Sequence, residues 1–143
     1  MEPLPASLIA RLREAAALTL RQQHVSQDTE VTIMLTDDAQ LQQLNRDYRG
    51  VDEPTDVLSF NIDMEMPEGH TYLGDIVIAV PLAESRARTA GHDLLAELAL
   101  LVVHGILHLL GYDHVGAGDR EAMWARQDDI LAQLELKARP TET

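Results

Sequence analysis

The sequence has 143 residues, a length typical of one domain, and 45% of them are hydrophobic, which excludes a disordered chain. It contains no cysteine, which excludes disulfides and thiolate metal sites and suits a reducing cytoplasm. The net charge of −13 at pH 7 counts against nucleic acid as a partner, although two arginine clusters, Arg46 with Arg49 and Arg86 with Arg88, leave room for a local basic cleft.

Hydrophobic periodicity and turn residues predict an α+β fold in one domain over residues 1–143. In chain order the predicted elements are a helix over 5–24, a strand over 31–35, a helix begun at 37–38 and ended by Gly50, short strands over 57–60 and 72–80, a helix from Pro81 closed by Gly91, a buried helix over 93–110 and a helix over about 119–138. We expect a small mixed sheet of three or four strands packed with about five helices.

The same periodicity predicts which side chains face inward. In the second helix the predicted apolar face is formed by Leu41, Leu44 and Tyr48. In the first short strand Val57 and Phe60 are expected in the core, and Ser59 is left undecided between solvent and substrate. The inward residues expected in the last helix are Met123, Ile130, Leu131 and Leu134.

Three histidines fall close together at the end of the apolar helix predicted over 93–110. His104 and His108 are four residues apart, so they lie on one face of a helix, about one turn from each other. Gly111 permits the left-handed conformation that ends a helix, and the turn brings His114 toward the same point. The spacing predicts that His104, His108 and His114 bind one metal ion.

Three neutral imidazoles without a thiolate suit zinc and leave a fourth position for water. Such a metal lowers the pKa of water toward about 7, which indicates hydrolysis rather than a structural role. The alternative is that these histidines are ordinary core residues, but each buried imidazole would then need another partner. The remaining histidines, His24, His70 and His92, lack this spacing and are expected at the surface.

The spacing H-x-x-x-H-x-x-G-x-x-H also occurs in metzincin peptidases, which carry a glutamate general base directly after the first histidine. Here Gly105 occupies that position. Glu97, two helical turns before His104, lies on roughly the same face, but it is expected to be too far from the metal to replace that base. The metal ligands therefore resemble those of a protease, and the catalytic machinery does not.

Three segments, HGILHLLGYDH, LNRDYRGVDEPTDVLSF and YLGDIVIAV, together resemble the bacterial YbeY family of rRNA maturation endoribonucleases over about Glu30 to His114. The resemblance implies a metalloprotease-like α+β fold and a zinc-dependent, single-strand-specific endoribonuclease. It further implies processing of the 3′ end of small-subunit rRNA and ribosome quality control in the cytoplasm. The implied partners are single-stranded RNA or rRNA and ribosomal proteins or assembly factors, with no membrane.

The resemblance places the family's zinc ligands on His104, His108 and His114 and its functional arginine on Arg49. A guanidinium holds a phosphate with two hydrogen bonds and stabilises the charge that develops in phosphoryl transfer. Without the resemblance, Arg49 would be interpreted as a cation favoured by the macrodipole at the C-terminal end of a helix.

The sequence departs from the usual family pattern at three places. The family usually has a strand before its first helix, whereas this sequence starts almost directly with the helix. The family often has an acidic residue after the third histidine and Met-Glu in the last helix, where this sequence has Val115 and Met123-Trp124. We therefore expect a sheet that is one strand smaller or has a differently covered edge.

Two other functions stay open: a metal-dependent hydrolase of another bond, such as an amide, and a non-catalytic ribosome-assembly factor with structural zinc. The nucleophile, water or the ribose 2′-OH, also stays open.

Overall fold

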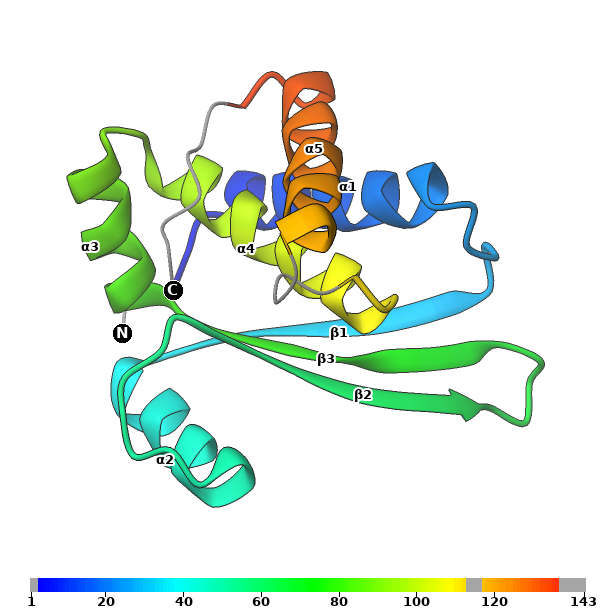
Figure 1. The fold of residues 1–143 in the computed structure, drawn as a ribbon, viewed down its shortest axis with the longest axis horizontal. Helices are drawn as coiled ribbons and strands as arrows, with labels where there is room; N and C mark the ends of the chain where they lie inside the picture. The colour runs from blue at the N-terminus through cyan, green and yellow to red at the C-terminus, as the bar shows by residue number, and fades with distance from the viewer. Residues whose placement is uncertain (1–2, 113–116, 137–143) are drawn as a thin grey trace.

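The computed structural model describes residues 3–112 and 117–136. The elements of these ranges are α1 (Ala6–Gln22), β1 (Thr29–Thr36), α2 (Asp38–Arg49), β2 (Val57–Glu65), β3 (Thr71–Ala79), α3 (Val80–Ala90), α4 (Leu94–Leu109) and α5 (Ala117–Gln133) (Figure 1). Their order and types confirm the predicted α+β class with a small mixed sheet.

β3 is the central strand of a three-stranded sheet with the order β1-β3-β2. β1 runs parallel to β3, and β2 runs antiparallel to it. The parallel pair needs a crossover, which α2 and β2 supply, whereas β2 and β3 form a hairpin. In the described part of the chain, β1 and β2 are therefore the two edges of the sheet.

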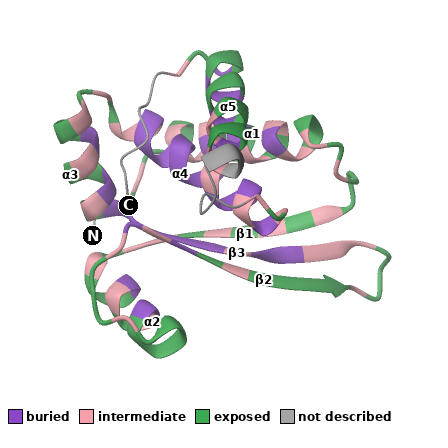
Figure 2. Cartoon of the chain, in the orientation of Figure 1, coloured by how far each residue is buried: buried purple, intermediate pink, exposed green. Residues whose placement is uncertain are grey.

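α4 is the central helix of the molecule. Figure 1 shows α1, α4 and α5 on one face of the sheet and α2 on the other. Buried residues occupy 12 of the 16 positions of α4, and Figure 2 shows the helix enclosed between its neighbours. A helix that is apolar on all sides is stable in water only when it is covered in this way, so the predicted buried helix is confirmed.

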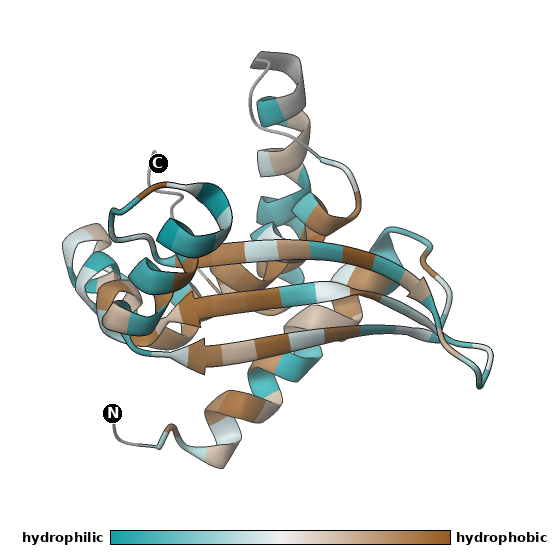
Figure 3. Ribbon diagram, turned by 90° about the horizontal axis from the view of Figure 1, so that it is seen from below, coloured by the Kyte–Doolittle hydropathy of each residue, from teal (hydrophilic) through white to brown (hydrophobic). Residues whose placement is uncertain are grey.

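A second, smaller apolar cluster joins α2 to the opposite face of the sheet. Its buried members are Leu41, Leu58, Val77 and Ala79. Figure 3 shows that the strands are more hydrophobic at this end than toward the β2–β3 hairpin. Asp38 of α2 accepts a hydrogen bond from the backbone N–H of Leu82 at 3.0 Å, which also ties α2 to α3.

Side-chain caps define where α2 and α4 begin. Asp37 accepts from the backbone N–H of Gln40 at 2.8 Å, and Asp93 accepts from that of Ala96 at 2.9 Å. Each cap satisfies one of the backbone donors left without an intrahelical partner in a first turn. Gly111 follows α4 with φ 103°, a conformation that strongly favours glycine. The predicted boundaries of both helices are therefore confirmed to within about a residue.

Two predicted boundaries were wrong. β2 continues to Glu65 instead of stopping at Phe60, because Asn61, Met64 and Glu65 pair with β3 around a bulge, although the side chains of residues 61–65 are exposed. α5 ends at Gln133 rather than near residue 138, and Glu135 adopts a left-handed conformation with φ 59°. Neither the pairing of exposed side chains nor a left-handed glutamate leaves a periodic signal in the sequence.

The inward faces were predicted correctly with one exception. Tyr48 is 71% exposed and only touches Phe60, edge to face, with ring centroids 5.5 Å apart. Val57 and Phe60 pack against the two apolar clusters, and Ser59 is exposed. The predicted inward residues of α5 are all buried: Met123, Ile130, Leu131 and Leu134.

Among the described residues, no single helix combines the length and the hydropathy needed to cross a membrane. α3 and α4 meet those criteria only when they are taken together, and the chain bends by 113° between them. Figure 1 shows this bend where α3 leads into α4.

Candidate metal centre

α4 holds His104 and His108 next to each other. Their ring centroids are 5.1 Å apart and the ring planes make an angle of 71°. Both side chains are half-buried, although most of the helix around them is fully buried. The spacing of one helical turn thus brings two imidazoles to one place, as the sequence predicts, and their role as metal ligands stays a prediction.

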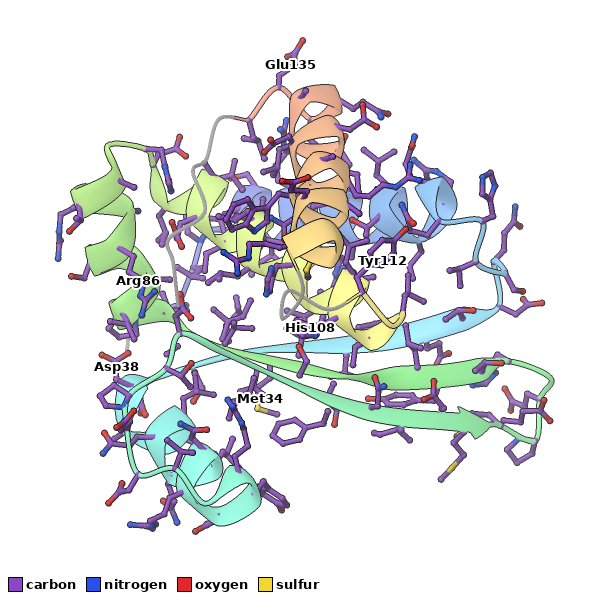
Figure 4. The ribbon with its side chains drawn as sticks, viewed as in Figure 1. Met34, Asp38, Arg86, His108, Tyr112 and Glu135 are labelled. Carbon is purple, nitrogen blue, oxygen red and sulfur yellow. The ribbon has the colours of Figure 1, made fainter. Side chains whose placement is uncertain are left out.

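The C-terminal end of α4 is closed by a tight turn. The backbone N–H of Gly111 donates to the carbonyl of His108, and that of Tyr112 donates to the carbonyl of Leu107, both at 3.0 Å. The Tyr112 hydroxyl donates to Gln23 Oε1 at 2.9 Å, which ties the turn to the end of α1. The turn is therefore fixed up to Tyr112, and Figure 4 shows His108 and Tyr112 together at this end of α4.

His114, the third predicted ligand, lies outside the described residues. Among the described residues, no group of three histidine, cysteine, aspartate or glutamate side chains is arranged to hold a metal ion. The described part of the predicted centre is therefore the pair on α4.

A buried glutamine contacts the first of these histidines. His104 Nδ1–H donates to Gln127 Oε1 of α5 at 2.6 Å, and Gln127 has no exposed surface. Histidines that bind zinc usually donate their second ring N–H to an oxygen in this way. The donor chemistry of the pair therefore fits zinc. Sequence reasoning missed Gln127, although a polar residue on the apolar face shared with Met123 and Ile130 was a signal for it.

Gly105 faces the sheet and lies very close to it. A Cβ atom added at Gly105 would lie 2.9 Å from Ile76 Cδ1, 3.0 Å from its Cγ2 and 3.1 Å from its Cγ1. Ile76 belongs to β3 and is fully buried. A glutamate at the position after the first histidine would therefore point into the packed core, so the base used by metzincins is sterically excluded here.

Arg49 is the last residue of α2, and its side chain is exposed. Within the described residues it makes no hydrogen bond or ion pair, whereas its neighbour Arg46 pairs with Asp47 at 3.5 Å. α2 packs on the face of the sheet opposite to α4 (Figure 1). The structure thus leaves Arg49 accessible to a ligand and does not bring it into contact with His104 or His108.

A group of buried charges lies at the other end of α4. His92 Nε2–H donates to Glu97 Oε1 at 2.6 Å, with side-chain exposures of 8% and 1%. The prediction that His92 is a surface residue was therefore wrong, because a carboxylate one turn into α4 draws the ring inward. The pKa of Glu97 is raised by burial, and the hydrogen bond from His92 opposes this effect. Glu97 is engaged here rather than at the histidine pair.

Asp56 and Arg86 belong to the same region. Arg86 Nε lies 3.4 Å from Asp56 Oδ2, and the Asp56 side chain is only 6% exposed. Burial raises the pKa of the Asp56 carboxyl, and the Arg86 guanidinium opposes this shift. The pair fixes the loop between α2 and β2 to α3. Figure 4 shows Arg86 well separated from His108. Arg86 therefore has a structural partner, as has Arg88, which lies 3.3 Å from Glu84.

Comparison with known proteins extends the resemblance to nearly the whole chain. Residues 4–135 match the family model described as Endoribonuclease YbeY. A protein of that name from Moorella thermoacetica is 44% identical over an alignment 143 residues long, and this alignment covers 94% of this chain and 92% of the relative. Another from Roseiflexus castenholzii is 47% identical over 137 residues, covering 92% of this chain and 84% of the relative.

The fold is also similar to a solved structure. The solution structure of TM1509 from Thermotoga maritima superposes with a TM-score of 0.60 and 26% sequence identity. The match covers 99% of this chain and 96% of that one. The similarity therefore includes the helices that surround α4 as well as the segments that carry the motifs.

Proposed function

Because the chain belongs to the endoribonuclease YbeY family, we propose that it is a zinc-dependent endoribonuclease that cleaves single-stranded RNA. In this proposal it matures the 3′ end of small-subunit rRNA and serves ribosome quality control in the cytoplasm, with ribosomal proteins or assembly factors as partners. The observation that supports it best is the pair of adjacent imidazoles on α4, one of which donates to a buried amide oxygen.

In this proposal His104 and His108 hold zinc from α4, and His114 completes the ligand set. When bound, zinc supplies a Lewis acid beside the scissile phosphate. The burial of α4 between α1, α5 and the sheet keeps the two imidazoles in place before substrate arrives, so little reorganisation is needed during the reaction. Arg49 contributes a guanidinium that binds a phosphate group through two charge-assisted hydrogen bonds.

Two features of the site count against hydrolysis of an amide by the metzincin route. The position of the glutamate base is occupied by Gly105, where a side chain would collide with Ile76. Glu97, the nearest carboxylate along α4 on that face, is buried against His92. Among the described residues, the site therefore has no counterpart of the glutamate that peptidases with this histidine spacing use as a proton acceptor.

The direct test is metal analysis combined with RNA cleavage. Purified protein is expected to carry about one zinc ion per chain, to cleave a labelled single-stranded RNA, to lose cleavage with a chelator and to regain it with added zinc. A double-stranded RNA of the same sequence is the control for strand specificity. The ends of the products identify the nucleophile, since a 2′,3′-cyclic phosphate indicates the ribose 2′-OH. Full cleavage by metal-free protein would contradict the proposal.

Arg49 gives a second prediction. Arg49→Ala is expected to lower kcat/KM for single-stranded RNA by roughly 10²-fold, because removing one charged donor from a transition state typically has this effect. Arg49→Lys should fall in between, since an ammonium does not reproduce the two-point contact. Zinc content and melting temperature should stay the same because the side chain is exposed. Arg46→Ala is the matched control, and equal losses from both variants would show a general charge effect instead.

A further inference from the structure

Gln127 is a polar residue in an otherwise apolar contact. It lies on the face of α5 that packs toward α4, where Met123 and Ile130 are also buried, and none of its surface is exposed. Burying an amide without hydrogen bonds costs about 1–3 kcal/mol, and a methionine of similar shape would fill the same space without that cost. The presence of glutamine here therefore requires a reason other than packing.

The contact with His104 supplies such a reason. Gln127 Oε1 lies 2.6 Å from His104 Nδ1, and the two residues are 23 positions apart on different helices. An amide oxygen accepts and cannot donate, so this bond keeps the imidazole proton on Nδ1. The lone pair then resides on Nε2, on the other side of the ring.

The amide nitrogen of Gln127 points to the same conclusion. Gln127 Nε2 is buried and has no hydrogen-bond partner among the described residues. A buried donor in that state is destabilising, so the residue is not optimal for stability alone. Among the described residues, the only side-chain hydrogen bond of Gln127 is the one that its oxygen accepts from His104.

We propose that Gln127 is a positioning residue of the metal centre: by accepting the Nδ1–H of His104, it sets the tautomer and the orientation of the ring so that Nε2 binds the metal. This inference rests on the proposed zinc dependence. Hydrogen-bond partners of ligating histidines commonly change metal affinity by about 10–100-fold when they are removed. Gln127 acts through His104 and has no contact of its own with substrate in this proposal.

The experiment compares Gln127→Met, which removes the acceptor at similar volume, with Gln127→Glu, which keeps an oxygen at the same place. Zinc affinity of the full chain is measured by competition with a chromophoric chelator. Gln127→Met should weaken zinc binding by about 10–100-fold, and Gln127→Glu should keep affinity within a few-fold of the original. Met123→Leu, a conservative change at another fully buried position of α5, is the control and should leave affinity unchanged.

Two further readouts separate positioning from stability and from the proposed function itself. The melting temperature of the metal-free Gln127→Met variant should change little, because the loss of the acceptor for the half-buried His104 ring is offset by removal of a buried amide nitrogen that has no described partner. Nitrogen chemical shifts of the His104 ring in the metal-free original protein should show the proton on Nδ1, and Gln127→Met should abolish that preference. These shifts do not depend on zinc, so they test the hydrogen bond even if the zinc proposal fails.

Each outcome bears on one idea. Unchanged zinc affinity in Gln127→Met, or a proton on Nε2 of His104 in the original protein, would overturn the inference about Gln127 and leave the proposed function standing. A protein that binds no zinc but shows the Nδ1–H tautomer would instead overturn the zinc proposal. Equal loss of affinity in Gln127→Met and Gln127→Glu would assign the effect to general disturbance of α5 and reject positioning.

Discussion

Replacing His108 by alanine is expected to lower the rate of single-stranded RNA cleavage by at least about 10³-fold at saturating zinc, because one of two imidazoles held by α4 is removed from the metal. The chain should remain folded, since His108 is only half-buried and its loss leaves no large core cavity. Single-turnover cleavage and circular dichroism melting, measured on the same preparations, test both parts.

The matched control for this variant is His70→Ala. His70 lies just before β3 and pairs with Glu30 at 3.4 Å, away from the described part of the metal centre. Its replacement removes one histidine from the chain without touching α4, so cleavage should stay within a few-fold of the original. A folded His108→Ala protein that still supports rRNA maturation would refute catalysis by this centre and favour the alternative of a ribosome-assembly factor with structural zinc.

The pair of histidines could be predicted from the sequence because helical spacing is a local property of the chain. Positions four apart on a helix share a face whatever the rest of the fold does, and Asp93 and Gly111 mark the ends of that helix. The same locality explains why α2 could be placed from Asp37 and Gly50. Elements whose boundaries depend on caps and periodicity were therefore predictable.

Features that depend on distant partners were not predictable. Gln127 acquires its role only because α5 packs against α4 and meets His104. Residues 61–65 become strand only because β3 pairs with Asn61, Met64 and Glu65. Tyr48 sits at the correct helical spacing, but it is 71% exposed and its ring meets only the edge of the sheet, at Phe60 of β2. Periodicity gives the face of a helix and not the extent of its neighbour.

Gly105 provides the prediction with the largest expected effect on stability. Gly105→Glu, which installs the residue that metzincins use as a base, should destabilise the fold by on the order of 5 kcal/mol, comparable with the whole stability of many domains. The added side chain would meet the fully buried Ile76, so its carboxylate would lose hydration inside the core. Denaturant titration of the soluble fraction measures the loss, and no peptidase activity should appear.

A double-mutant cycle locates the cause of that loss. Gly105→Ala adds only the Cβ; better helix propensity contributes about 1 kcal/mol, but crowding against Ile76 should cost about 1–3 kcal/mol. Ile76→Val removes Cδ1, the atom nearest to the new Cβ, and by itself should cost about 0.5–1.5 kcal/mol. If close packing of α4 on β3 is the reason for glycine, the double variant will be more stable than the sum of the single changes predicts.

The cycle also bears on why a protease-like metal site occurs here without the protease's base. A strictly additive cycle, or a Gly105→Glu protein that folds normally, would mean that space exists between α4 and the sheet and that the missing glutamate reflects chemistry alone. A favourable coupling between positions 105 and 76 would mean that the close approach of α4 to β3 excludes the glutamate. In that case α4, which carries His104 and His108, can pack this closely on β3 only because the residue directly after His104 has no side chain.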